Sequence, residues 1–170
     1  MKKALFLDRD GVINVEKNYL YKIEDFEFIE GIFDLCSYYQ AKGYKIFVVT
    51  NQSGIAREYY SEEDFEKLTS WMQNKFKENG VLISKVYHCS HHPDISGECD
   101  CRKPKPGMLL EAAKDFEVDL VNSIMVGDKE RDIEAAIHAG LQETYLFNEA
   151  NDIKSSKANK IVNKLENIWK

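Results

Sequence analysis

The sequence predicts an α/β fold of three layers, in which helices cover both faces of a mostly parallel, Rossmann-like sheet. Two observations support this prediction. Short apolar runs rich in β-branched residues alternate with stretches of helical periodicity along the chain. Four of the predicted strands are also followed by polar or charged residues, which is typical of the carboxyl edge of a parallel sheet. We expect right-handed crossovers between these strands.

The strands follow from short runs of apolar, β-branched and aromatic residues. We predict them over residues 4–7, 44–50, 81–88, 123–127 and 144–147, with a short edge strand near 161–162. The first run is too short for a helix and is followed by the turn-prone pair Asp10-Gly11. The run over 81–88 has the weakest pattern of the five.

The helices follow from apolar spacing and from residues that start or stop a helix. We predict them over residues 31–42, 61–79, 106–116 and 130–139, with a final helical turn or two at the end of the chain. Gly43 and Gly140 follow two of these helices as terminating residues. Ser61 begins a capping-box sequence, and Pro106 opens the third helix.

Composition narrows the possible functions. The chain has 170 residues, of which 44% are hydrophobic, enough for one domain over residues 1–170. The formal net charge of -6 argues against nucleic acid or a membrane surface as a partner. The apolar runs are shorter than the ~18 residues of a membrane span. The apolar run near the amino end, before Asp8, is also too short for a signal peptide. We therefore expect a cytosolic monomer.

Two carboxylates follow the first strand, and they point to metal-assisted chemistry. Asp8 and Asp10 come directly after this strand and are one residue apart. Alternation along an extended chain places both on the same side, with Arg9 turned away. Two such carboxylates repel each other unless a cation lies between them, and Mg²⁺ prefers oxygen ligands. The alternative for this stretch alone is an ordinary aspartate-rich turn.

Three further strand ends carry groups that suit phosphoryl transfer. Thr50 ends the second strand, Lys103 follows the third, and Asp128 follows the fourth. Carboxylates can hold a metal, while hydroxyl and ammonium groups stabilise the oxygens of a transferring phosphoryl group. Asp132 falls one turn into the next helix, where a favourable interaction with the helix dipole is the simpler explanation.

A second cluster combines thiols with imidazole. Cys89 and His91 form one close pair, and Cys99 and Cys101 form another. Three thiols and one imidazole fit a closed, structural zinc site. The alternatives to a zinc site are a disulfide and a redox-active pair of cysteines, and a disulfide is disfavoured in a cytosolic chain. His88 and His92 are rival ligands, whereas Cys36 lies on an apolar helix face and reads as a core residue.

These motifs resemble those of the haloacid-dehalogenase superfamily of phosphatases. The resemblance covers about residues 3–147 and rests on four motifs: Asp8-Arg9-Asp10-Gly11, Val49-Thr50-Asn51, Lys103 and Gly127-Asp128-Lys129-Glu130-Arg131-Asp132. It implies that Asp8 is the nucleophile and that Asp10 is the general acid and base. It also implies Mg²⁺ held by Asp8, Asp128 and the backbone carbonyl of Asp10. Thr50 and Lys103 would stabilise the phosphoryl oxygens, and Asp132 would position Lys103 or a metal-bound water.

The cysteine spacing narrows the resemblance to a branch without a cap domain, which contains heptose bisphosphate phosphatases and histidinol-phosphate phosphatases. The stretch over residues 50–57 resembles the heptose enzymes, with Ser53 and Arg57 where the histidinol branch usually differs. The resemblance implies removal of the 7-phosphate of a heptose 1,7-bisphosphate, a step toward nucleotide-activated heptose for lipopolysaccharide. The implied substrate contacts are Glu16, Lys17, Asn18, Tyr19, Asn51, Gln52, Ser53, Arg57, Arg102 and Lys129. Arg57 and Arg102 would serve the second phosphate, because arginine matches phosphate geometry.

Three alternatives stay open at this point. A histidinol-phosphate phosphatase would share the metal sites but meet only one phosphate. A non-catalytic phospho-receiver domain also gathers carboxylates, a threonine and a lysine at a sheet edge, but it has no aspartate two residues after its phosphoacceptor. A zinc-stabilised binding module would leave the polar strand ends unexplained.

Overall fold

The computed structural model describes residues 1–170 and contains one six-stranded sheet in which all strands run parallel. The strand order is β3-β2-β1-β4-β5-β6. The strands are β1 (Ala4–Leu7), β2 (Lys45–Asn51), β3 (Ile83–Cys89), β4 (Ile124–Gly127), β5 (Glu143–Phe147) and β6 (Lys160–Val162). All six lie where the sequence predicts a strand, including the short edge strand.

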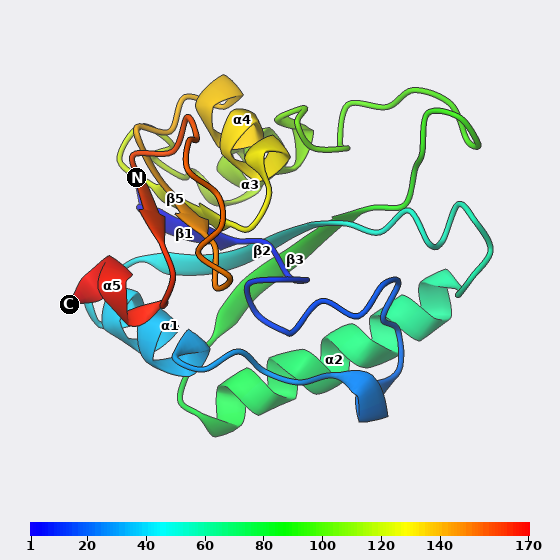
Figure 1. The fold of residues 1–170 in the computed structure, drawn as a ribbon, viewed down its shortest axis with the longest axis horizontal. Coiled ribbons are helices and arrows are strands. Elements are labelled where there is room, and N and C mark those ends of the chain that lie inside the picture. The colour runs from blue at the N-terminus through cyan, green and yellow to red at the C-terminus, as the bar shows by residue number, and fades with distance from the viewer.

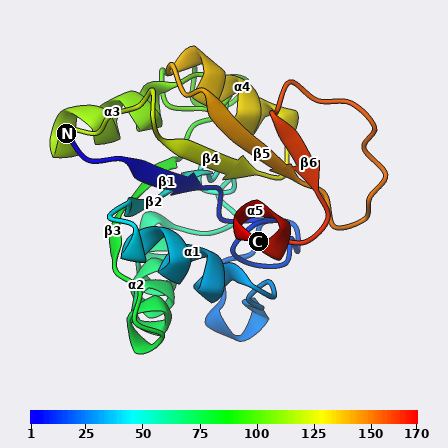
Figure 2. The same ribbon diagram turned by 90° about the vertical axis from the view of Figure 1, so that its left-hand side faces the viewer.

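Helices cover both faces of the sheet. They are α1 (Ile32–Ala41), α2 (Glu62–Glu78), α3 (Gly107–Phe116), α4 (Glu130–His138) and α5 (Glu166–Trp169), with a 3-10 turn η1 (Ile23–Asp25). Figure 1 shows α1 and α2 on one side of the sheet and α3 and α4 on the other, and Figure 2 shows the same layers after a quarter turn. The predicted three-layer α/β architecture is therefore confirmed, and only η1 falls where the sequence predicts no element.

Burial on both faces explains why the central strands are apolar throughout. In β1, Leu5 and Leu7 pack on the side of α1 and α2, whereas Ala4 and Phe6 pack on the side of α3 and α4. Successive side chains of a strand point to opposite faces, so a strand with two covered faces needs apolar residues at every position. The phenyl ring of Phe6 also stacks on that of Phe47 in β2, with ring centroids 5.5 Å apart.

Local signals set the helix ends as expected. The Ser61 hydroxyl accepts a hydrogen bond from the Asp64 amide, and the Asp64 carboxylate accepts one from the Ser61 amide. This reciprocal pair starts α2 at the predicted place. Gly43 and Gly140 both have positive φ after α1 and α4, a conformation that glycine adopts without strain.

No helix of this structure is both long enough and apolar enough to cross a membrane.

The sheet order places β1 at a topological switch point. From β1 the chain moves to β2 and β3 on one side, and then returns to β4 on the other side of β1. Ligands bind in α/β sheets at such a point, beyond the carboxyl ends of the strands. Leu7, the last residue of β1, lies opposite Val48 of β2 and Val126 of β4. The residues that follow these three strands therefore meet at one edge.

Candidate active site

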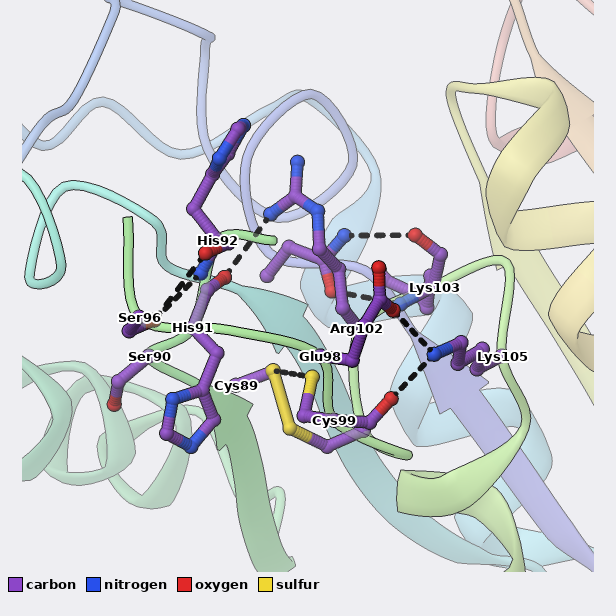
Figure 3. Close-up of a disulfide and its surroundings, with 12 residues drawn as sticks. Cys89, Ser90, His91, His92, Ser96, Glu98, Cys99, Arg102, Lys103 and Lys105 are labelled. Atoms are coloured by element: carbon purple, nitrogen blue, oxygen red, sulfur yellow. Dashed lines mark hydrogen bonds and ion pairs between the residues drawn. A yellow bond between two sulfur atoms is a disulfide. The ribbon is translucent and has the colours of Figure 1, made fainter. Parts of the chain in front are cut away.

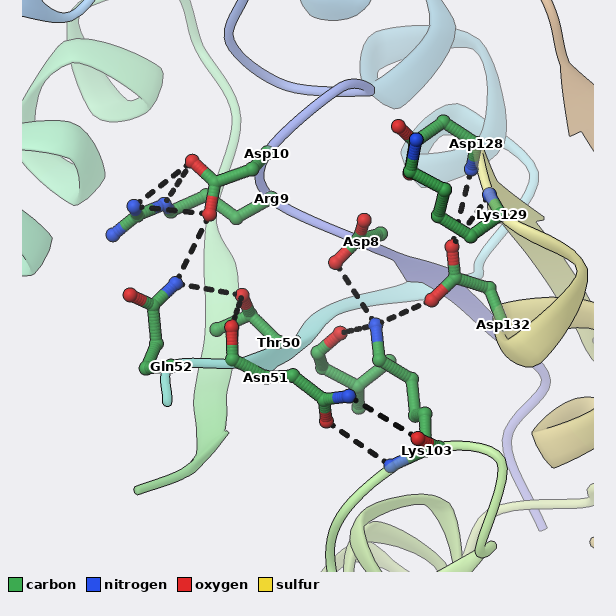
Figure 4. Close-up of polar contacts among 11 residues, drawn as sticks. Asp8, Arg9, Asp10, Thr50, Asn51, Gln52, Lys103, Asp128, Lys129 and Asp132 are labelled. Carbon is green, nitrogen blue, oxygen red and sulfur yellow. Dashed lines mark hydrogen bonds and ion pairs between the residues drawn. The ribbon is translucent and has the colours of Figure 1, made fainter. Parts of the chain in front are cut away.

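Lys103 joins the carboxylates that follow β1 and β4. Its Nζ lies 2.9 Å from Asp8 Oδ1 and 2.6 Å from Asp132 Oδ1, and it donates a 2.8 Å hydrogen bond to the Val49 carbonyl (Figure 4). The lysine is only 2% exposed. A buried ammonium is tolerated only when it is paired and hydrogen-bonded, and Lys103 meets both conditions. Three strand ends that are distant in the sequence therefore meet, as the sequence predicted, and Asp132 contacts Lys103, one of the two roles that the resemblance implied for it.

The loop that carries Lys103 is attached to the end of β2. The Asn51 side chain donates a 3.2 Å hydrogen bond to the Lys103 carbonyl and accepts a 3.0 Å bond from the Lys103 amide. Both ends of this amide are thus occupied by the backbone of one residue. Asn51 lies at the cavity where a substrate contact was predicted, but the bonds it makes in this structure position Lys103.

Burial and like charge dominate the electrostatics of Asp8. Burial raises the pKa of Asp8 well above its ordinary value, Asp132 and Asp128 raise it further, and Lys103 opposes them. For Lys103, burial acts to lower the pKa, but Asp132 and Asp8 outweigh it and the pKa is raised. The ammonium therefore stays charged. Additional positive charge near Asp8 is needed to keep this carboxylate ionised, because one lysine serves two buried carboxylates.

Asp128 provides an independent test of whether a cation fits this centre. Its Oδ1 is buried without a hydrogen-bond partner. Burial first, and Asp132 next, raise the pKa of Asp128 from 3.8 to about 6. Carboxylate oxygens of Asp8, Asp128 and Asp132 lie within 4.8 Å of one another. A buried carboxylate oxygen without a donor is what a hard divalent cation would satisfy, so the residues present fit Mg²⁺.

Asp132 is the least available of these three carboxylates. Its Oδ1 pairs with Lys103, and its Oδ2 accepts hydrogen bonds from the amides of Asp128 (3.2 Å) and Lys129 (3.0 Å).

Gly11 allows the turn after β1 to lie close to the carboxylate that follows β4. A Cβ on Gly11 would lie 2.0 Å from Asp128 Oδ2, and its φ is +90°, so only glycine fits beside this carboxylate.

Asp10 has partners that the sequence reading did not anticipate. The Arg9 guanidinium was expected to turn away, but its Nη2 lies 2.9 Å from Asp10 Oδ1 and also donates to the Leu20 carbonyl. The prediction was wrong because β1 ends at Leu7, so strand alternation no longer holds at residues 8–10. Asn14 Nδ2 and Gln52 Nε2 donate to the two oxygens of Asp10, at 3.0 Å and 3.1 Å. Three donors thus hold this carboxylate.

A polar cavity of about 320 Å³ opens above these residues. Its lining contains the predicted site residues Asp8, Asp10, Glu16, Asn18, Tyr19, Asn51, Gln52, Ser53, Arg57, Arg102, Lys103, Asp128 and Lys129. Thr50 and Asp132 are buried and do not line it. Lys17 also lies outside the lining, and its Nζ donates to the Asp25 carbonyl at 2.9 Å.

Two lining residues, Tyr60 and Arg131, were missed by the sequence analysis. Arg131 sits in the first turn of α4, within the quoted motif, but a charge at an exposed helix position has no distinguishing pattern. Burial, and then Arg131 and Arg57, lower the pKa of Arg102. No carboxylate forms a salt bridge with any of these three arginines. Their mutual repulsion favours an anion between them.

The cysteines gather at the end of β3, as predicted, but their bonding differs from the prediction (Figure 3). Cys89 and Cys101 form a disulfide, the alternative that the sequence disfavoured, and the Cys99 Sγ lies 3.6 Å from that of Cys89. The three sulfurs lie within 4.8 Å of one another, which suits a metal when all three are thiolates. His91 belongs to the same loop but not to this three-sulfur group. Cys36 is buried in the core, as expected.

Known proteins with the same organisation support this description. Residues 2–140 match the family model described as haloacid dehalogenase-like hydrolase. The chain is 54% identical over 147 residues to a D-glycero-alpha-D-manno-heptose-1,7-bisphosphate 7-phosphatase from Campylobacter jejuni, covering 86% of this chain and 83% of that protein. It is 45% identical over 175 residues to a D-glycero-beta-D-manno-heptose-1,7-bisphosphate 7-phosphatase from Haemophilus ducreyi, covering 98% and 96%.

A solved structure of a similar protein has the same fold. The D,D-heptose 1,7-bisphosphate phosphatase from B. bronchiseptica, complexed with magnesium and phosphate, superposes with a TM-score of 0.84 at 26% identity, covering 98% of this chain and 95% of that one. The match extends along almost the whole of both chains, without room for a separate cap domain. On the family match, the sequence identity and the sheet topology together, this chain belongs to the haloacid dehalogenase-like hydrolases.

Proposed function

We propose that this protein removes the 7-phosphate of D-glycero-D-manno-heptose 1,7-bisphosphate. The observation that carries the proposal is a single cavity that joins the Asp8–Lys103 centre to three arginines without carboxylate partners. A substrate with two phosphates satisfies both parts of this cavity at once. The curated relatives that match over most of their length act on this bisphosphate, according to their names.

Asp8 is the proposed nucleophile. An oxygen of its carboxylate attacks the phosphorus of the 7-phosphate, and the bond from phosphorus to the sugar oxygen breaks as the new bond forms. Lys103 contacts this same carboxylate, so its ammonium is placed to stabilise the negative charge on the phosphoryl oxygens. The Thr50 hydroxyl, which lies beside Gln52, is the proposed second donor to these oxygens.

Asp10 is the proposed general acid and base. It gives a proton to the departing sugar oxygen, and later takes one from the water that hydrolyses the aspartyl-phosphate. These steps return Asp8 to a free carboxylate and release inorganic phosphate. Asp10 lines the cavity and is held by Arg9, Asn14 and Gln52, so its position is defined before the substrate binds.

Mg²⁺ is the proposed cofactor of this centre. Asp8, Asp128 and the backbone carbonyl of Asp10 would hold it, and it would supply positive charge at the transferring phosphoryl group. The unpartnered, buried Oδ1 of Asp128 supports this assignment.

Zn²⁺ is the proposed structural metal of the loop after β3, with Cys89, His91, Cys99 and Cys101 as ligands. The two rival histidines are already engaged: His88 Nε2 lies 2.7 Å from Glu62 Oε2, and His92 Nδ1 accepts the Asp94 amide. The metal would order a loop that ends in Arg102 and Lys103.

The remaining lining residues are proposed to select the sugar and its second phosphate. Glu16, Asn18, Tyr19, Ser53 and Lys129 line the cavity around the proposed position of the heptose. The anomeric phosphate would bind Arg57 and Arg102. The relatives include enzymes named for the alpha and for the beta anomer, so the preferred anomer is a matter for measurement.

The test is a panel of phosphate esters compared by kcat/KM. It contains both anomers of heptose 1,7-bisphosphate, fructose 1,6-bisphosphate and histidinol phosphate, with Asp8→Asn as the inactive control. We expect a heptose bisphosphate to be the best substrate. Arg102→Ala should lower kcat/KM by about 10–100-fold on it, because arginine–phosphate contacts contribute about 1.5–3 kcal/mol, but little on a small monophosphate.

Lys85→Ala is the matched control for that variant, because Lys85 is a partly exposed cation paired with Asp115 and remote from the cavity. Lys85→Ala should leave kcat/KM unchanged on both the heptose bisphosphate and the small monophosphate. A preference for histidinol phosphate would contradict the proposal, and so would an equal loss on all esters in Arg102→Ala. A stable phosphoprotein without turnover would instead indicate a phospho-receiver.

A further inference from the structure

Tyr60 has a hydrogen bond that no role in the proposed reaction has used. Its hydroxyl donates to Gln52 Oε1, and both residues are buried, with Tyr60 6% and Gln52 3% exposed. Burial, first among the causes, raises the pKa of Tyr60, so the hydroxyl keeps its proton and acts as a donor. This pair lies at the wall of the cavity.

The ring of Tyr60 is firmly held. Tyr21 stacks on it with ring centroids 5.4 Å apart and an interplanar angle of 10°. A Cβ on Gly54 would lie 2.2 Å from Tyr60 Cε1, so the ring fills the space that this glycine leaves open. The hydroxyl can therefore move little relative to Gln52.

The bond from Tyr60 determines which way the Gln52 amide faces. Because Oε1 accepts from the tyrosine, Nε2 faces the opposite way, where it donates to Asp10 Oδ2 at 3.1 Å and to Thr50 Oγ1 at 2.9 Å (Figure 4). While Asp10 is ionised, the reverse orientation would place the amide oxygen against a carboxylate oxygen, and neither can donate. The tyrosine donor and the Asp10 acceptor thus require the same amide orientation.

We propose that Tyr60 is a positioning residue for the general acid Asp10, acting through the side-chain amide of Gln52. This inference rests on the proposed phosphatase reaction. The tyrosine hydroxyl makes its hydrogen bond to Gln52 and none to Asp10. Its hydroxyl holds the glutamine amide, and the amide holds one oxygen of the Asp10 carboxyl in place. Without the hydroxyl, Gln52 Oε1 is buried without a donor, and the amide can turn its nitrogen away from Asp10.

The leaving group separates this role from a merely structural one. A sugar alkoxide needs a proton as it departs, whereas p-nitrophenolate is a stable anion and needs none. A defect in the position of Asp10 should therefore lower kcat/KM, which reports only the steps up to departure of the leaving group, far more for the sugar ester than for p-nitrophenyl phosphate. A general loosening of the fold should slow both equally.

The experiment compares Tyr60→Phe with Tyr87→Phe on both esters. Tyr87 is also buried, and its hydroxyl donates a 2.8 Å hydrogen bond to Asp115 on the opposite side of the sheet. Each variant removes one tyrosine hydroxyl and keeps the ring, and melting temperatures check that both proteins are folded. Complete loss of an acid–base group costs about 10²–10⁴-fold, so misplacing it in Tyr60→Phe should lower kcat/KM on heptose 1,7-bisphosphate by about 10-fold.

On p-nitrophenyl phosphate the same variant should lower kcat/KM by less than about 2-fold, because departure of that leaving group does not use the acid. Hydrolysis of the aspartyl-phosphate, which both esters share, does not enter kcat/KM. Tyr87→Phe should leave kcat/KM unchanged on both. A double-mutant cycle with Gln52→Ala adds a second readout: if Tyr60 acts through Gln52, Tyr60→Phe should have no further effect in that background.

An equal loss on the two esters, no loss at all, or additive effects in the cycle would each overturn the role of Tyr60. Failure of the proposed function looks different, because the wild-type protein itself would then fail to hydrolyse heptose 1,7-bisphosphate.

Discussion

At the scale of single residues, Lys103 and Asp128 differ in whether their charged groups have partners within the protein. Lys103 is fully satisfied, with two carboxylates and one carbonyl around its ammonium. Asp128 is not, because one of its oxygens is buried without a donor and its pKa is raised to about 6. A centre that keeps an unsatisfied carboxylate gives up stability for binding, since metal must be able to enter and leave.

This contrast gives a pH-dependent prediction for Asp128→Asn without divalent metal. The native pKa of about 6 lies above the ordinary value of 3.8, so the native state holds more protons than the unfolded state between these values. The free energy of unfolding of the wild type must therefore fall as the pH rises from about 4 through 6, and stay lower above that. Asparagine does not ionise and avoids this loss.

We expect Asp128→Asn to melt a few degrees above the wild type at pH 7.5, since about 1 kcal/mol moves the melting temperature by about 2–4 °C at this size. At pH 4.5 the difference should shrink, because less of the wild-type carboxylate is ionised there. Thermal melts at the two pH values measure this. A difference of the same size at both would show that the effect is not ionisation. The variant should also lose Mg²⁺-dependent activity.

At the scale of elements, the loop between β3 and α3 is the part whose state most affects the centre. It follows Cys89, the last residue of β3, contains Cys99 and Cys101, and brings Arg102 and Lys103 beside the cavity. Asn51 holds Lys103 to the end of β2, and Glu62, at the start of α2, accepts hydrogen bonds from Ser90 and from His88 of β3. Whatever closes the cysteine cluster therefore positions two cations of the cavity.

Cys99→Ala tests whether that closure is a zinc site. In protein purified under reducing conditions, elemental analysis should find about one zinc per chain in the wild type, and none in Cys99→Ala. Activity should fall with the metal, because Arg102 and Lys103 lose their support. The matched control is Cys36→Ala, whose sulfur is buried in the core far from the cluster and should not affect zinc.

Full zinc occupancy in Cys99→Ala would mean a different ligand set. A zinc-free wild type would indicate that the Cys89–Cys101 disulfide closes the loop instead.

At the scale of the whole molecule, the carboxyl-terminal segment completes the core without reaching the active site. Val162, Leu165 and Ile168 are buried in the same cluster as the residues of α1. Leu165 packs against the start of α1, where a Cβ on Gly31 would lie 3.5 Å from Leu165 Cβ. None of these side chains lines the catalytic cavity.

Stability and catalysis should therefore separate at Leu165. Leu165→Ala should lower the free energy of unfolding by about 2–4 kcal/mol, because the side chain is 1% exposed and its removal leaves a cavity. Leu82→Ala removes the same atoms from a side chain that is 70% exposed, and should change it by less than about 0.5 kcal/mol. Urea unfolding measures both. A large loss of kcat in folded Leu165→Ala would show that the tail does influence the site.

Much of this architecture could be predicted from the sequence, because it depends on local patterns. Strand and helix positions follow from periodicity and capping residues within each segment, as in α2 after Ser61. The meeting of Asp8, Lys103 and Asp132 follows from parallel topology, which brings the carboxyl ends of β1, β3 and β4 to one edge whatever lies between them.

The partners of individual side chains were decided only by the tertiary structure. Arg9 turns back to Asp10 because β1 has already ended, and no spacing rule applies within the turn that follows. Gln52 faces Asp10 because Tyr60, eight residues later, occupies its other end. Which sulfurs bond, and that Arg131 joins Arg57 and Arg102, likewise depends on how distant segments pack. Local sequence patterns determine elements and their order, whereas hydrogen-bond partners in turns and loops are selected by the packing of the whole chain.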